Sequence, residues 1–182
     1  RVVGNLNRFA ADGQPTVDQR VLNKNLFVSK KYNKQGGSFM IGKTIEELKV
    51  GDTAKFSKTV SESDVYLFAG VTGDLNPAHV SEEFAKDTFF KTRIAHGMLS
   101  ASFISTVIGT MMPGPGSVYM RQEANFLAPV KFGDTITAIV EVAEIIADKK
   151  RVRLKTYCIN QEKTVVVDGE ALVSPPRAPK ND

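Results

Sequence analysis

The sequence predicts an α+β domain in which an antiparallel β-sheet wraps around one long apolar helix. Residues 97–112 are apolar almost all round, which is typical of a buried helix. Four later segments instead alternate apolar and polar residues with a period of two, as half-buried strands do: 117–127, 134–147, 151–160 and 164–173. Only residues 148–150 and 161–163 separate the last three segments, so we expect antiparallel hairpins there.

The part of the chain before the apolar helix predicts one strand and two helices. Thr53 to Val60 is expected to form a strand. Ser61 has the properties of a helix N-cap and is followed by acidic residues in the first turn, which predicts a helix to about Val71. Gly73 to Val80 is expected to be a loop, since Asn-Pro disfavours helix continuation, and the Ser81 segment starts a short second helix.

The chain has 182 residues, 42% of them hydrophobic and 24% charged, and this composition points to one globular domain. No uninterrupted apolar run reaches the roughly 18 residues that a membrane-spanning helix needs, so we expect no membrane partner. The single cysteine, Cys158, excludes an internal disulfide framework and favours a reducing compartment: the cytoplasm, or an organelle matrix if the leader is a targeting remnant. Its place in an alternating strand predicts a packed apolar side chain.

The net charge of +4 is unevenly distributed along the chain. Residues 1–39 carry seven basic and two acidic residues, and the remainder carries 17 basic and 18 acidic ones. A nearly neutral body gives no reason to expect a nucleic-acid partner. We therefore predict a flexible N-terminal extension, or a cloning or targeting remnant, over 1–39, a folded domain over 40–175, and a loose tail over 176–182.

One short segment carries residues suited to acid–base chemistry. Asp74 and His79 lie five residues apart, and Pro77 between them favours a bend that can bring the two side chains together. A carboxylate beside an imidazole can accept, hold and return a proton of water near neutral pH. The structural alternative is that Asp74 and Asn76 form a turn while His79 caps the next helix.

A second segment, from Arg93 to Leu99, places Gly97 at the start of the apolar helix. The first N–H groups of a helix lack intrahelical acceptors, and the helix dipole reinforces them. If such donors were directed at the carbonyl oxygen of a thioester, they would stabilise the enolate oxygen that forms when a nucleophile adds at the β carbon. The alternative is that Gly97 is there only for close packing.

These segments resemble the MaoC-like hydratase family, which includes the (R)-specific enoyl-CoA hydratases. The resemblance rests on Phe68 to His79, which is similar to the hydratase-2 motif, and on Ile94 to Ala101, which is similar to the start of the family's oxyanion helix. The turn 113–116 and the segments 125–130 and 133–134 follow in the same order. The resemblance covers about Met40 to Pro175 and implies a hot-dog fold.

The resemblance also implies an activity, the reversible syn addition of water to a trans-2-enoyl-CoA. Asp74 and His79 match the catalytic pair, Asn76 a residue that orders the pair or the substrate, and Gly97 the backbone donor to the thioester oxygen. His96 is expected to support the turn before the helix. No metal and no cofactor other than the CoA thioester substrate are implied. A homodimer, alone or within a higher oligomer, is expected.

Two other functions are compatible with the sequence. A hot-dog acyl-CoA thioesterase needs a carboxylate and an oxyanion helix but has less use for His79. A non-catalytic acyl-CoA-binding module needs neither the carboxylate of Asp74 nor the imidazole of His79. The motifs do not distinguish CoA from acyl-carrier protein, the acyl chain length, or polyester precursor supply from other fatty-acid pathways. An acyl tunnel is expected along four apolar residues: Leu67, Phe68, Met98 and Phe103. The CoA phosphates are expected near three basic residues: Lys91, Arg93 and Arg121.

Overall fold

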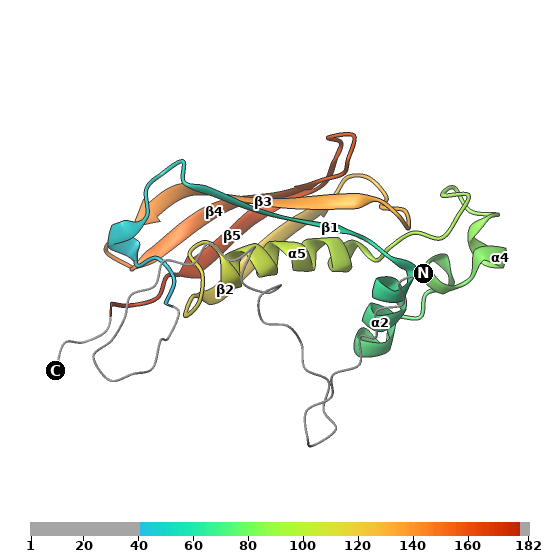
Figure 1. Ribbon diagram of the computed structural model, residues 1–182, viewed down its shortest axis with the longest axis horizontal. Coiled ribbons are helices and arrows are strands. Elements are labelled where there is room, and N and C mark those ends of the chain that lie inside the picture. Colours follow the sequence, from blue (N-terminus) through green and yellow to red (C-terminus); the bar gives the residue numbers. More distant parts are fainter. Residues whose placement is uncertain (1–40, 179–182) are drawn as a thin grey trace, which may run out of the picture. The chain divides into compact units, whose positions relative to one another are not determined.

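A five-stranded antiparallel sheet and one central helix dominate residues 41–178, the part of the chain described by this computed structural model (Figure 1). The leader expected over 1–39 lies outside the described residues, as do residues 179–182 of the expected tail. At the C-terminal end, Pro175 and Pro176 are buried, whereas Arg177 and Ala178 are exposed.

The sheet has the strand order β1-β3-β4-β5-β2, so β1 and β2 form its edges. All four neighbouring pairs are antiparallel. The strands span Thr53–Thr59 (β1), Val118–Phe126 (β2), Thr135–Ile146 (β3), Arg151–Ile159 (β4) and Val165–Ser174 (β5). Each strand lies within a residue or two of its predicted range, and the two short connections form the expected hairpins.

The period of two places one face of the sheet in the core, as predicted. Alternate residues of β3 and β4 are fully buried: Ile136, Ala138, Val140 and Val142, and Val152, Leu154, Thr156 and Cys158. The residues between them on β4 face outward, where Arg153 pairs with Glu144 and Glu170. Because each strand repeats this alternation, the sheet has one apolar face for a helix to cover.

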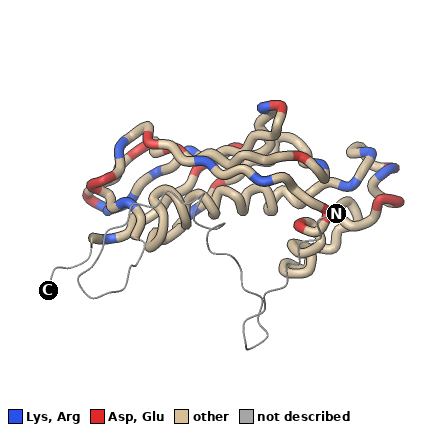
Figure 2. Tube along the Cα trace, viewed as in Figure 1, with Lys and Arg blue, Asp and Glu red and all other residues tan. Residues whose placement is uncertain are grey.

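Helix α5 (Gly97–Thr110) packs against that face and contacts all five strands. Its residues Ile104, Val107 and Ile108 are almost completely buried in the central core cluster. The buried helix that the sequence predicts is covered on only part of its surface in the single chain, because Met98 is 59% exposed, and Ser102 and Ser105 on the same side are also exposed. The helix carries no charged residue along its length (Figure 2).

Four shorter helices complete the described chain. Of these, α2 and α4 lie at the end of the sheet where α5 begins (Figure 1). Ser61 caps α2 (Glu62–Thr72) as predicted, in a capping box with Asp64. Ser81 caps α4 (Glu82–Ala85), also as predicted. The expected loop 73–80 is partly helical instead, because Pro77 occupies the first position of α3 (Pro77–Val80), where its missing N–H costs nothing. The 3-10 helix η1 spans Ile45–Glu47.

No helix among residues 41–178 combines the length and apolarity needed to cross a membrane. The predicted α+β, hot-dog arrangement is confirmed: a single antiparallel sheet wraps around one apolar helix.

Leu154 and Lys155 are neighbours on β4 with opposite environments, the first fully buried and the second exposed on the outer face. We expect Leu154→Ala to lower the free energy of unfolding by about 2–5 kcal/mol, because it leaves a cavity in the core. Lys155→Ala is the matched control and should change it by less than about 0.5 kcal/mol. Equal losses for the two variants in urea unfolding would contradict the assigned strand register.

Cys158 is buried, and its burial raises the pKa of the thiol to about 12. At about pH 8 the reactive thiolate is therefore roughly one part in 10⁴ of the native protein. We expect iodoacetamide to leave Cys158 unmodified in native protein at that pH and to alkylate it after unfolding in guanidinium. Mass spectrometry reads the result cleanly because the chain has one cysteine. Rapid alkylation of native protein would contradict the described burial.

Candidate active site

The segment between α2 and α3 reverses the chain direction within a few residues. Gly73 ends α2 in the left-handed conformation, with φ of 78°, and its N–H donates to the carbonyl of Ala69. The next turn is closed by Asp74 Oδ1, which accepts from the N–H of Asn76 at 3.2 Å. Asn76 Oδ1 in turn caps α3 by accepting from the N–H of Ala78. These short bonds bring His79 back toward Asp74.

His79 is held in one orientation by a backbone carbonyl. Its Nδ1 lies 2.8 Å from the carbonyl oxygen of Ile94. A carbonyl can only accept, so Nδ1 carries the proton of this bond, and in the neutral ring Nε2 is left with a free lone pair. The Ile94 N–H also donates to the carbonyl of Ala78, so Ala78 and His79 are both bonded to Ile94. The ring therefore presents a base at Nε2.

His96 ties the Asp74 turn to the start of α5. Its side chain is 2% exposed, and Nε2–H donates to the backbone carbonyl of Asp74 at 2.9 Å. The ring lies between Phe68 and His79, with centroid distances of 5.0 and 3.8 Å. Its Nδ1 has no hydrogen-bond partner among residues 41–178. These contacts fit the supporting role expected from the sequence.

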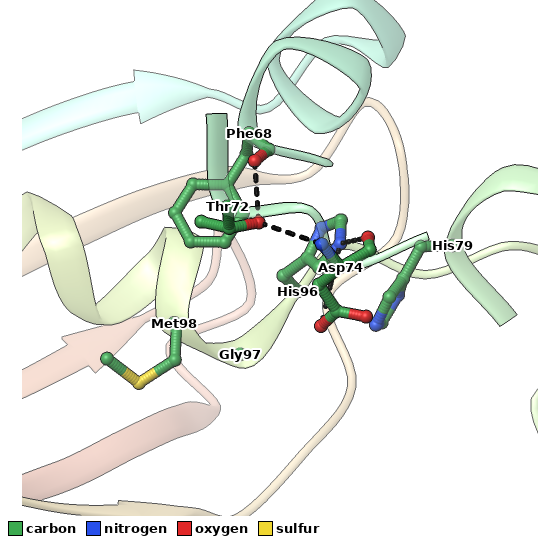
Figure 3. A pocket seen from close by; sticks show the side chains of 7 residues that line it. All are labelled: Phe68, Thr72, Asp74, His79, His96, Gly97 and Met98. Atoms are coloured by element: carbon green, nitrogen blue, oxygen red, sulfur yellow. Dashed lines mark hydrogen bonds and ion pairs between the residues drawn. The ribbon is translucent and has the colours of Figure 1, made fainter. Parts of the chain in front are cut away.

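The Asp74, His79 and His96 side chains converge. Each offers one carboxylate oxygen or ring nitrogen, and these atoms lie within 4.8 Å of one another. Figure 3 shows the Asp74 carboxylate directed toward the His79 ring. Two groups that hydrogen-bond one water at ordinary distances and angles are roughly 4.6 Å apart. A separation of no more than 4.8 Å is short enough for a single water to contact both Asp74 and His79, and the 54% exposure of the Asp74 side chain gives water access.

The first turn of α5 supplies backbone donors next to this pair. The N–H groups of Gly97 and Met98 donate to no acceptor within the described part of the chain. Gly97 also lies against the Phe126 ring, which a Cβ at this position would approach to 2.7 Å. Gly97 therefore permits close packing, and its N–H has no acceptor among the described residues, as the role of a donor to a ligand requires.

Two cavities meet at the start of α5. One of about 280 Å³ contains the polar groups, and its lining is shown in Figure 3: Phe68, Thr72, Asp74, His79, His96, Gly97 and Met98. The second, of about 580 Å³, is mainly apolar and shares His79, Gly97 and Met98 with the first. A thioester carbonyl at Gly97 would therefore have space on both sides, one of them beside Asp74.

The same three side chains suit a metal ion less well. His79 Nδ1 and His96 Nε2 are already bonded to backbone carbonyls, and the two rings are stacked with a tilt of 34°. Ring nitrogens bind a metal along the ring plane at about 2.0–2.1 Å, so stacked rings do not direct their lone pairs to one point. The geometry favours acid–base chemistry on water.

Several residues expected near the substrate lie elsewhere. Asn76 lines neither cavity and uses its side-chain oxygen as a helix cap. Leu67 is 68% exposed, and Phe103 packs edge-on against Phe56 in the core, so only Phe68 and Met98 of the expected tunnel line a described cavity. Lys91, Arg93 and Arg121 line neither cavity; the last two form ion pairs with nearby glutamates.

Three contributors to the site were not found from the sequence. The carbonyl of Ile94 orients His79, yet a backbone atom leaves no sequence signal. Thr72 Oγ1 accepts from the N–H of Asp74 and donates to the carbonyl of Phe68. Ser100 lines the larger cavity with a buried hydroxyl that has no partner among residues 41–178.

Comparison with known proteins identifies the relatives of this chain. The model of the MaoC like domain family matches residues 47–167. The chain is 55% identical, over 72% of its own length and 90% of the relative's, to an (R)-specific enoyl-CoA hydratase of Rhodospirillum rubrum. It is 51% identical, over 75% and 87%, to a 3-hydroxybutyryl-CoA dehydratase of Methylorubrum extorquens.

A solved structure agrees with this assignment. The unliganded R-hydratase PhaJ1 from Pseudomonas aeruginosa superposes with a TM-score of 0.72 at 44% identity, over 75% of this chain and 88% of that one. The match to the family model covers well over half of the chain and includes both motifs and the helix α5. This chain belongs to the MaoC-like domain family.

Proposed function

We propose that this protein is an (R)-specific enoyl-CoA hydratase, which adds water reversibly to a trans-2-enoyl-CoA to give the (R)-3-hydroxyacyl-CoA. The observation that carries the proposal is the convergence of Asp74 and His79 beside the free N–H of Gly97. Relatives at 55% and 51% identity support it, since one is named for the hydration and the other for the reverse dehydration.

The proposed reaction uses each group at a stated atom. The thioester oxygen accepts from the N–H of Gly97, which draws electron density from the double bond and makes C3 electrophilic. Water held by Asp74 and His79 adds its oxygen to C3, while one of the two residues takes a proton from it. The electron pair of the double bond moves into an enolate whose oxygen Gly97 stabilises. A proton is then delivered to C2, and the product is the 3-hydroxyacyl thioester.

Asp74 and His79 act in this proposal as one acid–base pair, in which either residue accepts the water proton and the other donates a proton to C2. One carboxylate oxygen of Asp74 and one ring nitrogen of His79 lie within 4.8 Å of each other, so both residues can contact the same water and each offers an atom that accepts a proton. Since both lie on one side of the cavity shared with Gly97, the hydroxyl and the proton reach the same face of the double bond. The proposed addition is therefore syn.

We expect purified protein to hydrate crotonyl-CoA, observed as loss of the enoyl absorbance without release of thiol. Asp74→Asn and His79→Gln should each lower kcat by about 10²–10⁴-fold, the usual contribution of a general acid–base group. Asp87→Asn is the matched control, because Asp87 is an exposed carboxylate just after α4 that lines neither cavity. It should keep wild-type kcat.

Three other results would contradict the proposal. Release of free thiol would identify a thioesterase. Binding of the thioester without turnover would identify a non-catalytic binding module. Wild-type kcat in either site variant would remove Asp74 and His79 from the mechanism.

The protein is further proposed to work as a homodimer on a CoA or acyl-carrier-protein thioester, in a reducing compartment such as the cytoplasm. The edge strand β2 and the adjacent face of α5 expose apolar side chains that a second copy would cover: Val118 (59%), Met120 (45%), Phe126 (51%), Leu127 (60%) and Met98 (59%). Unpaired strand edges of this kind favour pairing with another strand.

We expect light scattering after gel filtration to give twice the chain mass of 19.9 kDa, or a multiple of that dimer. Val118→Asp should shift the mass toward the single chain, because a charge on β2 would be buried at the interface. The control Val50→Asp alters a residue that is 65% exposed in the turn before β1 and should leave the mass unchanged. A wild-type mass of one chain would contradict the dimer.

A further inference from the structure

Arg93 is the centre of an ion-pair network beside the candidate active site. Its Nη1 lies 2.5 Å from Glu62 and 3.0 Å from the Tyr66 hydroxyl on α2, and its Nε lies 3.2 Å from Glu82 on α4. The backbone N–H of Arg93 donates to the same Glu82 oxygen. The guanidinium also lies over the Phe132 ring at 4.8 Å. One side chain thus joins two helices to the loop between β2 and β3.

This network reaches His79 from both sides along the backbone. Arg93 directly precedes Ile94, whose carbonyl accepts the proton of His79 Nδ1 at 2.8 Å. Arg93 also donates to the Tyr66 hydroxyl, which donates to the carbonyl of Val80, the residue after His79. Movement of Arg93 would therefore displace both the acceptor that orients the imidazole and the helix that carries it.

Arg93 is the shielded member of this network, whereas the Glu62 and Glu82 side chains are 53% and 51% exposed. The Arg93 side chain is 19% exposed, and the aromatic ring below it excludes water from one face. The N–H and guanidinium of Arg93 hold the pKa of Glu82 below its usual value. The charged network therefore persists above that ordinary pKa and is lost only as the pH falls through the lowered one.

We propose that Arg93 is a positioning residue for hydration: it fixes the Ile94 carbonyl and α3 so that His79 keeps Nε2 directed at the reacting water. The inference rests on the proposed hydratase function. Arg93 touches neither cavity and acts only through His79. Its planar fork is required, because a lysine ammonium cannot bond α2 and α4 in the same geometry.

Arg153 on β4 provides a matched control within the same chain. It also lies between two glutamates, with Nε 2.9 Å from Glu144 and Nη1 2.6 Å from Glu170. These residues lie on the outer face of the sheet, and none of them lines either cavity. Loss of either arginine removes a doubly paired guanidinium, and only Arg93 is connected to His79.

The test compares Arg93→Met, Arg93→Lys and Arg153→Met in steady-state hydration of crotonyl-CoA. Arg93→Met should lower kcat by about 10–100-fold with little change in KM, because small displacements of a catalytic group have effects of this size. Arg93→Lys should be intermediate, and Arg153→Met should keep kcat. In a His79→Gln background, Arg93→Met should cause no further loss, since its effect passes through His79.

A second readout does not depend on turnover. In wild-type protein labelled with nitrogen-15, the His79 Nδ1–H should give a protected imidazole signal, which Arg93→Met should broaden or abolish and Arg153→Met should preserve. Preserved kcat and an unchanged Nδ1–H signal in Arg93→Met would overturn the inference, even if its melting temperature fell. If Arg93→Met does not fold, Arg93→Lys and Glu82→Gln decide by the same criteria.

Failure of the proposed function is distinguishable from failure of this inference. Wild-type protein that does not hydrate crotonyl-CoA removes the hydratase assignment, while the Nδ1–H signal still reports whether Arg93 positions His79. If the wild-type protein hydrates crotonyl-CoA but the losses of kcat from Arg93→Met and His79→Gln add up in the double variant, only the positioning role of Arg93 is removed.

Discussion

The hydrogen bond from His79 Nδ1 to the carbonyl of Ile94 is the interaction on which the arrangement of the site depends. It sets which ring nitrogen carries the proton, and it joins the segment after α2 to the segment before α5. The buried His96 makes the second connection, from the start of α5 to the carbonyl of Asp74. Together these two bonds bring the Asp74 carboxylate, the His79 ring and the N–H of Gly97 to one cavity. In each bond the acceptor is a backbone carbonyl, so the orientation of the imidazoles depends on how the backbone is held and not on a partner carboxylate.

The fold explains why this constraint can be maintained. Helix α5 is fixed over the sheet by core residues such as Ile104 and Val107, which are almost completely buried, so its first turn is a stable reference point for the site. The opposite side of the helix is exposed in the single chain, and it borders the edge strand β2. The site therefore lies at the start of a helix that the core holds in place. The exposed side of this helix is the surface that we propose a second copy covers. The chemistry then needs few residues, because the helix start provides the donors and two short loops provide the acid–base pair.

The sequence predicted the sheet well because alternation is a local property. The buried set on β3 and β4 follows directly from the period of two, and Ser61 marks the start of α2 by its capping chemistry. The sequence also singled out Asp74, His79 and Gly97, which line one cavity, because a proline between an acid and a histidine and a glycine before an apolar helix are visible patterns. The short helix α3 was missed because Pro77 was interpreted as a helix breaker, whereas it occupies the first helical position. The role of the Ile94 carbonyl could not be predicted, since backbone acceptors carry no sequence signal. Arg93 was interpreted as a ligand for phosphate because its glutamate partners lie 11 and 31 residues away in the sequence.

In the proposed reaction Asp74 and His79 act from one side of the substrate, so the hydroxyl and the C2 proton are added to the same face of the double bond. The most direct measurement is the stereochemistry of the product formed from crotonyl-CoA in deuterium oxide, read from the proton coupling between C2 and C3 at early turnover. We expect one deuterium at C2 on the same face as the C3 hydroxyl. Deuterium on the opposite face, or distributed equally between both faces in the first turnovers, would contradict a water held between Asp74 and His79.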